Sequence, residues 1–278
     1  MISLFPALVA CSVGGADRVI LQSKGSDTIV NLMQLLSEDY TKSNPNVIVA
    51  VTGGGSGTGV KSLVDRTTDM ANASREMKPR EIEVAEKNGV HPHETIIAYD
   101  GLAIYVAKEN PIADLSFDDL KCIYGAEGTC KRWSDLGVKL DCGGNDEILK
   151  VGRQNNSGTY EYFRDEVLGK DGKFTNTMDQ SGTQQVVDVV GTSKCAIGYG
   201  GMGYHSDTVR FVCLSEKEGE PCAEPSIEAV KRKEYTFSRP LYVYTDGPPK
   251  GETQAFLTWV LGDGGQKVAL DAGFVPVN

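Results

Sequence analysis

Three short loops of this chain carry hydroxyl side chains and glycines in patterns that suit an anion site. They are Gly25-Ser26-Asp27-Thr28, 53–59 and 153–159. Each follows a short apolar, strand-like segment and precedes a segment with helical periodicity, so each places hydroxyls and free backbone N–H groups at the start of a helix. One such loop also fits an ordinary turn, because Gly and Ser are common there. The three together predict a site for one small tetrahedral oxyanion.

The third loop has the most specific pattern, because it adds a cation to the donors. Arg153 comes just after the apolar run 148–151, and Ser157, Gly158 and Thr159 precede a helix-like segment. Gly158 lets the backbone approach a ligand closely, the two hydroxyls donate, and Arg153 adds a planar charged fork. Taken alone, Arg153 also fits a surface ion pair.

The glycine loop 53–59 does not fit a nucleotide site. A P-loop needs Lys directly after its final Gly, whereas here Val60 separates Gly59 from Lys61. Taken alone, Ser56 fits a flexible turn and Thr28 a helix N-cap. The sequence therefore disfavours an ATPase and leaves the oxyanion hypothesis in place.

Size and charge narrow the class of protein. The chain has 278 residues, is 40% hydrophobic and carries a formal net charge of -10. This length allows two lobes of ordinary size. The acidic balance disfavours nucleic acid and acidic membrane surfaces as partners, while a few donors aimed at a small anion can still bind it locally.

Alternating strand-like and helix-like segments predict an α/β fold. The strand-like runs are 47–51, 96–106 and 241–244, and the helix-like runs are 29–40, 80–87, 160–167, 184–190 and 254–261. Ser116 and Asp119 form a capping-box pattern, and Pro79 suits a first helical turn.

The chain has no long linker, so we expect two lobes joined by extended crossings. Tyr99-Asp100-Gly101 and Ser238-Arg239-Pro240 are the candidate crossings. The predicted boundaries are 17–98 plus 240–278 for one lobe and 99–239 for the other. Loops at the carboxyl ends of strands then meet in a cleft between the lobes.

The first sixteen residues suggest export. An apolar run ends in Leu8-Val9-Ala10-Cys11 and a polar, Gly-rich stretch follows, which resembles the end of a bacterial lipoprotein signal. We expect residues 1–16 to be a signal or tether remnant and the protein to be periplasmic or on the cell surface, with Cys11 as a candidate lipid anchor.

The six remaining cysteines predict disulfides, because their number is even and the chain looks exported. Cys213 and Cys222 would staple a hairpin, and another bridge is expected among Cys122, Cys130 and Cys142. Free buried thiols are the alternative. Zinc is disfavoured because no Cys-x-x-Cys pair occurs.

Other reactive side chains do not form a recognisable centre. Pro92 holds His91 and His93 extended, which predicts an exposed turn, and His205 is remote in sequence. Zinc sites need at least three protein ligands, and no nucleophile has motif support, so we expect no metal, no cofactor and no enzyme activity.

The motifs together resemble the phosphate-binding proteins of bacterial and archaeal ABC importers. The resemblance runs from about Ser23 to Val277 and includes the runs 25–28, 55–61, 69–75, 153–159 and 196–199. It implies a two-lobed periplasmic-binding-protein fold of type II that closes on inorganic phosphate. It also implies ABC permease subunits as partners, and we expect a monomer.

The resemblance also implies a set of phosphate-binding residues. The predicted set is Thr28, Ile29 through its backbone, Ser56, Ser74, Arg75, Asp100, Arg153, Ser157, Gly158 and Thr159. Many members of the family carry an Asp near the end of the third motif, where this chain has Ser74-Arg75. A carboxylate there accepts the proton that phosphate has and sulfate lacks. Asp100 or Asp27 could supply that acceptor, or Asp100 could pair with Arg75.

The predicted function is high-affinity phosphate binding for an ABC importer. A binding protein for sulfate, molybdate or arsenate is the alternative within the same class. A phosphate-releasing hydrolase that uses Arg153 as a clamp would need a metal cluster or nucleophile. A surface adhesin or sensor that keeps the fold without transport is the remaining alternative.

Overall fold

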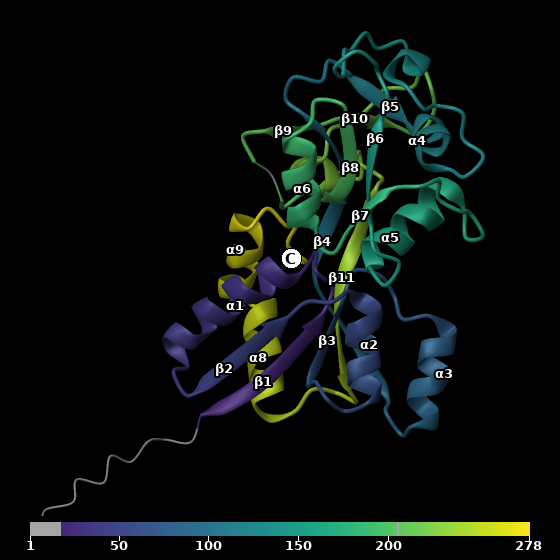
Figure 1. Ribbon diagram of the computed structural model, residues 1–278. Coiled ribbons are helices and arrows are strands. Elements are labelled where there is room, and N and C mark those ends of the chain that lie inside the picture. The colour runs from purple at the N-terminus through teal and green to yellow at the C-terminus, as the bar shows by residue number, and fades with distance from the viewer. Residues whose placement is uncertain (1–17, 205) are drawn as a thin grey trace, which may run out of the picture.

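The computed structural model describes residues 18–204 and 206–278, and it has two lobes of mixed α/β structure (Figure 1). Lobe 1 contains β1, β2 and β3, and lobe 2 contains β6, β7 and β8. Two long strands, β4 and β11, run between them near the middle of the molecule. The expected α/β, two-lobed fold is therefore confirmed.

Four strands of the lobe 1 sheet run in one direction, and one strand runs opposite to them. In spatial order they are β2 (Val47–Thr52), β1 (Val19–Gly25), β3 (Met70–Ala73), β11 (Ser238–Asp246) and β4 (Pro92–Ala107). β1 lies parallel to both β2 and β3, and β11 is antiparallel to β3 and β4. The helices are α1 (Val30–Ser43), α2 (Ser56–Val64), α3 (Pro79–Lys87), α8 (Gly251–Leu261) and α9 (Asp263–Asp271).

Helices cover both faces of this sheet, and each face has its own apolar core. Leu32, Leu36 and Tyr40 of α1 are buried on one face, where the ring of Tyr40 meets Phe256 of α8 edge-on at 5.2 Å. Residues of α2 and α3, such as Leu63, belong to a second buried cluster on the other face. Burial on both faces explains why these strands are mostly apolar.

Lobe 2 is built on a smaller mixed sheet with longer loops. Its strands are β6 (Leu149–Arg153), β7 (Met178–Gln180), β8 (Ala196–Gly201) and β9 (Val209–Phe211), with a separate pair β5 (Asp114–Ser116) and β10 (Cys213–Ser215). Its helices are α4 (Phe117–Tyr124), α5 (Gly158–Phe163), α6 (Thr183–Gly191) and α7 (Ile227–Lys231), with 3-10 and π turns at Trp133–Leu136 and Arg164–Leu168. Phe163 at the end of α5 stacks on Tyr199, and Tyr124 meets both rings edge-on, which makes a buried aromatic cluster.

β4 is the element that physically joins the lobes. Its first part pairs with β11, from Pro92 to Gly101, and its second part pairs with β8 and β9, from Leu102 to Ala107. The strand changes partners at Gly101, so both predicted crossings lie where β4 and β11 pass between the lobes. Loops from both lobes consequently converge beside Asp100 and Arg239.

Three disulfides lie within residues 122–222, all in lobe 2. The predicted bridge between Cys213 and Cys222 is confirmed, with Cα atoms 5.5 Å apart. Cys122 bonds to Cys130, as expected for a bridge within the first cysteine group. The third links residues far apart in sequence, Cys142 and Cys195. Cys11 lies outside the described residues.

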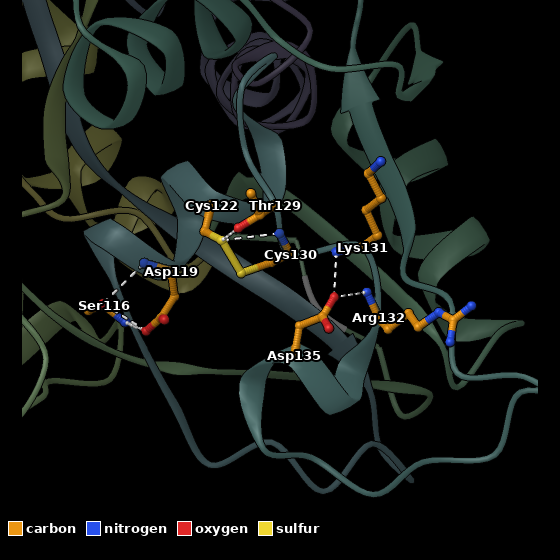
Figure 2. Close-up of a disulfide and its surroundings, with 8 residues drawn as sticks. All are labelled: Ser116, Asp119, Cys122, Thr129, Cys130, Lys131, Arg132 and Asp135. Atoms are coloured by element: carbon orange, nitrogen blue, oxygen red, sulfur yellow. Dashed lines mark hydrogen bonds between the residues drawn. A yellow bond between two sulfur atoms is a disulfide. The ribbon is translucent and has the colours of Figure 1, made fainter.

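Figure 2 shows the Cys122–Cys130 disulfide, with Cys122 in the C-terminal half of α4, together with the cap at the start of this helix and the turn that follows the bridge. The expected capping box is confirmed, because the hydroxyl of Ser116 accepts from the N–H of Asp119 at 3.1 Å and the Asp119 carboxylate accepts from the N–H of Ser116 at 2.8 Å. The carboxylate of Asp135 accepts from the backbone N–H groups of Lys131 and Arg132, just after the bridge.

The histidine segment differs from the expectation. Pro92 and His93 begin β4 and pair with β11, so the predicted turn at His91-Pro92-His93 is wrong for two of the three residues. His91 is exposed, and its ring Nδ1 lies 2.6 Å from the Glu86 carboxylate. Over the described ranges, no three His, Cys, Asp or Glu side chains are grouped as metal ligands. His205 is not described.

Within residues 18–204 and 206–278, no helix has the length and apolar character needed to cross a bilayer.

Candidate functional site

All three predicted anion loops connect a strand to a helix. The first joins β1 to α1, the second joins β2 to α2, and the third joins β6 to α5. Ser56 and Gly158 are the first residues of α2 and α5, positions whose backbone N–H has no partner within the helix. Two loops belong to lobe 1 and one to lobe 2. The contacts between them lie at the interface of the two lobes, called the joint below.

The first loop contacts the third through a pair of hydroxyls. The Oγ1 atoms of Thr28 and Thr159 lie 2.7 Å apart, and both side chains are buried. The hydroxyl of Tyr204 donates to the backbone carbonyls of Asp27 and Thr28, which fixes this loop from the lobe 2 side. The N–H of Ile29, expected as a donor to the ligand, donates instead to the carbonyl of Ser26 at 3.1 Å.

The second loop contacts the third through backbone groups. The side-chain amide of Asn156 donates to the carbonyl of Gly54 at 2.8 Å, and the N–H of Gly57 donates to the carbonyl of Asn156 at 3.2 Å. Gly55 has φ 89°, and a Cβ there would lie 2.6 Å from the carbonyl oxygen of Asn156. Only glycine permits this approach of the two lobes.

Ser74 completes a group of hydroxyls at the end of β3. It accepts a hydrogen bond from Ser26 at 2.9 Å, and its N–H donates to the hydroxyl of Ser56 at 3.1 Å. A Cβ at Gly158 would lie 2.4 Å from the Ser56 Oγ and 2.6 Å from the Ser74 Oγ. Lobe 2 therefore reaches this hydroxyl group only because residue 158 has no side chain. Ser157 caps α5 by accepting from the N–H of Thr159.

Arg153 lies at the end of β6 and is fully buried. Its guanidinium donates to the hydroxyl of Thr183 and the carbonyl of Ser181, both at 3.0 Å, and lies 3.6 Å from the carboxylate of Asp27. Burial lowers the pKa of Arg153, and the charge of Asp27 opposes that effect. An arginine keeps its charge even so, and the site therefore contains a cation held by lobe 2.

Asp100 and Arg239 face one another where the two crossing strands meet. Their side chains form an ion pair of 3.1 Å, and Arg239 also donates to the hydroxyl of Thr159 and the carbonyl of Gly158. Burial raises the pKa of Asp100 to about 6, while the charge and hydrogen bond of Arg239 act in the opposite direction. The alternative that Asp100 pairs with Arg75 is wrong, because Arg239 takes that position.

Sequence reasoning missed Arg239 as a site residue. The run Ser238-Arg239-Pro240 was identified only as a crossing, although an arginine at such a crossing must lie between the lobes. Ser26 and Asn72 were missed as well. Asn72 lies two residues before Ser74, and its amide donates to the hydroxyl of Ser23.

The structure places Arg75 away from the hydroxyl group. Both of its terminal nitrogens donate to the carboxylate of Glu81 at 2.8 Å, and its Nε lies 2.8 Å from the carboxylate of Glu161. Arg75 is thus the predicted site residue that the structure does not bring together with the others. Its charge is engaged by two carboxylates.

Several buried polar atoms at this joint have no hydrogen-bond partner within the described part of the chain. They include Oδ1 of Asp100, the Nε atoms of Arg153 and Arg239, Oδ1 of Asn72 and the hydroxyl of Tyr199. Buried polar groups are nearly always hydrogen-bonded in folded proteins. Donors and two acceptor oxygens, those of Asp100 and Asn72, remain without partners there, as expected of a site for a small polar ligand.

The fold and this site define a class of protein, the two-lobed substrate-binding proteins. Residues 12–264 match the family model of the PBP superfamily domain. A solved structure with bound phosphate from Clostridium perfringens, assigned to the substrate-binding protein of a phosphate ABC transporter, superposes with a TM-score of 0.81 at 26% identity, covering 93% of this chain and 100% of that chain.

Curated relatives define the family more narrowly. The phosphate-binding protein PstS of Pseudomonas aeruginosa is 36% identical over 269 residues, covering 92% of this chain and 83% of that protein. PstS of Staphylococcus saprophyticus is 33% identical over 263 residues, covering 92% and 79%. This chain belongs to the PBP superfamily and, within it, to the family of PstS phosphate-binding proteins.

Proposed function

We propose that this protein binds inorganic phosphate between its lobes and delivers it to an ABC importer. The observation that carries the proposal is the buried joint where Thr28, Ser56 and Ser74 of lobe 1 meet Arg153 and Thr159 of lobe 2. The names of the family members support phosphate as the ligand. Such a protein performs no chemistry on its ligand, and its function is the difference between open and closed states.

Neutral donors supply most of the binding in this proposal. The two nearest carboxylates, Asp27 and Asp100, balance the charges of Arg153 and Arg239. The site therefore has little net charge to offer an anion. Hydrogen bonds to a charged group contribute about 1.5–3 kcal/mol each, so eight to ten from hydroxyls, amides and guanidinium groups would offset the large cost of dehydrating phosphate. We propose Thr28, Ser56, Ser74, Arg153, Ser157, Gly158, Thr159 and Arg239 as the donors.

Asp100 is the proposed filter against sulfate. Its Oδ1 is buried without a partner within the described residues, and its Oδ2 is held by Arg239. An ionised carboxylate can accept the proton of hydrogen phosphate, whereas fully ionised sulfate would place two acceptors in contact. Asp27 is less suited to this role, because its carboxylate is engaged by the N–H of Gly54 and faces Arg153.

The remaining architecture supports a transport role. We propose lobe boundaries of 17–98 plus 240–278 and 99–239, with the hinge in β4 and β11. Disulfides in lobe 2 favour a location outside the cytoplasm. We propose that the protein acts there as a monomer, anchored through Cys11, and that its partners are the permease subunits.

Isothermal titration calorimetry with phosphate, arsenate, sulfate and molybdate tests the proposed ligand. We expect tight phosphate binding and sulfate binding weaker by at least about a hundredfold, as expected when a buried carboxylate rejects the wrong anion. Tight binding of sulfate or molybdate together with no response to phosphate would overturn the proposal. Turnover of a chromogenic phosphate ester would favour the hydrolase alternative instead.

A further inference from the structure

An ion cluster beside the site joins charges from both lobes. Arg75 and Lys78 follow β3 in lobe 1, and Glu161 lies on α5 in lobe 2. The Oε2 atom of Glu161 lies 2.8 Å from the Nε of Arg75 and 2.9 Å from the Nζ of Lys78. A single carboxylate oxygen of lobe 2 is thus shared by two cations of lobe 1.

The cluster is largely shielded from water. The side chains of Glu161 and Arg75 are 7% and 9% exposed, whereas Lys78 is 48% exposed. Ion pairs in such a position are screened by salt less than surface pairs are. The Arg75–Glu161 contact can therefore contribute more than the usual fraction of a kcal/mol of an exposed pair.

Lobe 1 positions Arg75 independently of lobe 2. Glu81 receives a hydrogen bond from each terminal nitrogen of Arg75 and another from the backbone N–H of Lys78, all at 2.8 Å. Burial lowers the pKa of Arg75, but Glu81 and Glu161 raise it more, so the net shift is upward. This fork fixes the guanidinium, and its Nε lies within ion-pair distance of Glu161 although the Nε–H makes no hydrogen bond among the described residues.

Glu161 has no comparable support inside lobe 2. Within residues 18–204 and 206–278, its carboxylate forms ion pairs with Arg75 and Lys78 alone. When the lobes separate, Arg75 keeps Glu81 and Glu161 becomes hydrated. The free energy of the Glu161 contacts therefore contributes to lobe closure rather than to the folding of either lobe.

We propose that Glu161, Arg75 and Lys78 form a closure latch that sets how tightly the protein holds phosphate, an inference that rests on the proposed function. Arg75 follows Ser74 directly and Glu161 lies two residues after Thr159, so the latch lies on the same two segments as the proposed donors. Ligand and latch both favour the closed state, and each strengthens the other. Arg75 and Glu161 are positioning residues, and neither needs to touch the ion.

The test compares Glu161→Gln with the wild type. Glutamine keeps the size and removes the charge, and Arg75 retains Glu81. We expect the Kd for inorganic phosphate to rise about tenfold, mostly through faster dissociation measured by stopped flow, because loss of a shielded charge pair chiefly changes the off-rate. The melting temperature of the ligand-free protein should stay unchanged.

Glu83→Gln is the matched control. Glu83 pairs with Lys87 along α3 at 2.6 Å, but both side chains are well exposed and lie in one lobe. The Glu83→Gln substitution should change the Kd for phosphate by less than about twofold. If Glu161→Gln lowers the melting temperature, Lys78→Gln provides a second variant, with a smaller expected increase in off-rate of about threefold.

Small-angle scattering without ligand separates the two proposals. The latch predicts that a smaller fraction of ligand-free molecules is closed in Glu161→Gln than in Glu83→Gln, and hence that Glu161→Gln has the larger radius of gyration. This expectation does not depend on the identity of the ligand. If the wild type does not bind phosphate, the proposed function fails and this comparison still tests the latch. Equal off-rates and equal scattering for Glu161→Gln and the wild type would overturn the latch.

Discussion

The two lobes present similar donors from differently stabilised scaffolds. Lobe 1 holds its loops between parallel strands covered by helices on both faces, and its described residues contain no cysteine. Lobe 2 has longer loops and all three disulfides. Both nevertheless place hydroxyls and free N–H groups at a strand-to-helix turn. The comparison indicates that the proposed anion site depends on those turns and on the approach of the lobes, whereas the described disulfides cross-link lobe 2 alone.

The largest expected effect is the loss of the buried cation of lobe 2. Arg153→Gln should weaken phosphate binding at least about a thousandfold, or about 4 kcal/mol, because a charged hydrogen-bond donor in a buried site has no substitute. Calorimetry measures this change. Arg132→Gln, an exposed arginine of the same lobe, is the control and should bind as the wild type does. An Arg153→Gln protein that binds within tenfold of the wild type would contradict the proposed site.

Removing the long-range disulfide should cost stability without changing the site. The Cys142–Cys195 bridge spans 53 residues, and the chain-entropy estimate for such a loop is about 4 kcal/mol, compared with about 2.5 kcal/mol for the nine-residue Cys213–Cys222 loop. Urea unfolding of the two double Cys→Ser variants measures this order. The folded variants should keep their phosphate affinity. The reverse order of stabilities would show that loop entropy does not govern lobe 2.

A substitution at Gly158 tests whether the two lobes approach one another as closely as the structure shows. Gly158→Ala should weaken phosphate binding about a hundredfold, because the new methyl group would overlap the hydroxyls of Ser56 and Ser74 only in the closed state. Gly57→Ala is the matched control at the same joint, since its Cβ would lie 3.6 Å from the nearest atom, an ordinary contact. Equal affinities of the two variants would argue against the closed geometry.

The smallest expected effect concerns anion selectivity. With a pKa of about 6, Asp100 is ionised above that pH and protonated below it. Protonation turns an acceptor into a donor, so the preference for phosphate over sulfate should fall about tenfold between pH 8 and pH 5. At pH 8 Asp100→Asn should prefer phosphate over sulfate about tenfold less than the wild type does, a comparison at one pH that does not depend on the ionisation of phosphate itself. Competition binding with labelled sulfate at both pH values measures this ratio, and an unchanged ratio in Asp100→Asn would remove Asp100 as the filter.

Local sequence patterns predicted the elements and loops well, because periodicity and helix-start signals act over a few residues. The helix predicted at 29–40 corresponds to α1, the capping box at Ser116 is present, and the predicted Cys213–Cys222 bridge closes a short loop beside the isolated antiparallel pair Leu214 and Ala223. All three predicted anion loops lie between a strand and a helix.

The contacts that the sequence did not predict join segments that are distant along the chain. Arg239 meets Asp100 across 139 positions, and Cys142 meets Cys195 across 53. No local pattern specifies such partners. Arg75 could be assigned by its motif but not by its surroundings, because Glu161 approaches it only after the lobes fold and close. Glu81 of lobe 1 accepts from both terminal nitrogens of Arg75, and Glu161 approaches its Nε from lobe 2.

A crystal structure of the protein grown with phosphate tests the central claim most directly. The account predicts one ion at the joint, with oxygens about 3 Å from donors of both lobes, including Thr28 and Ser56 on one side and Arg153 and Thr159 on the other. It also predicts an ion oxygen in contact with Oδ1 of Asp100. An ion held by one lobe alone, or bound away from these residues, would contradict the account.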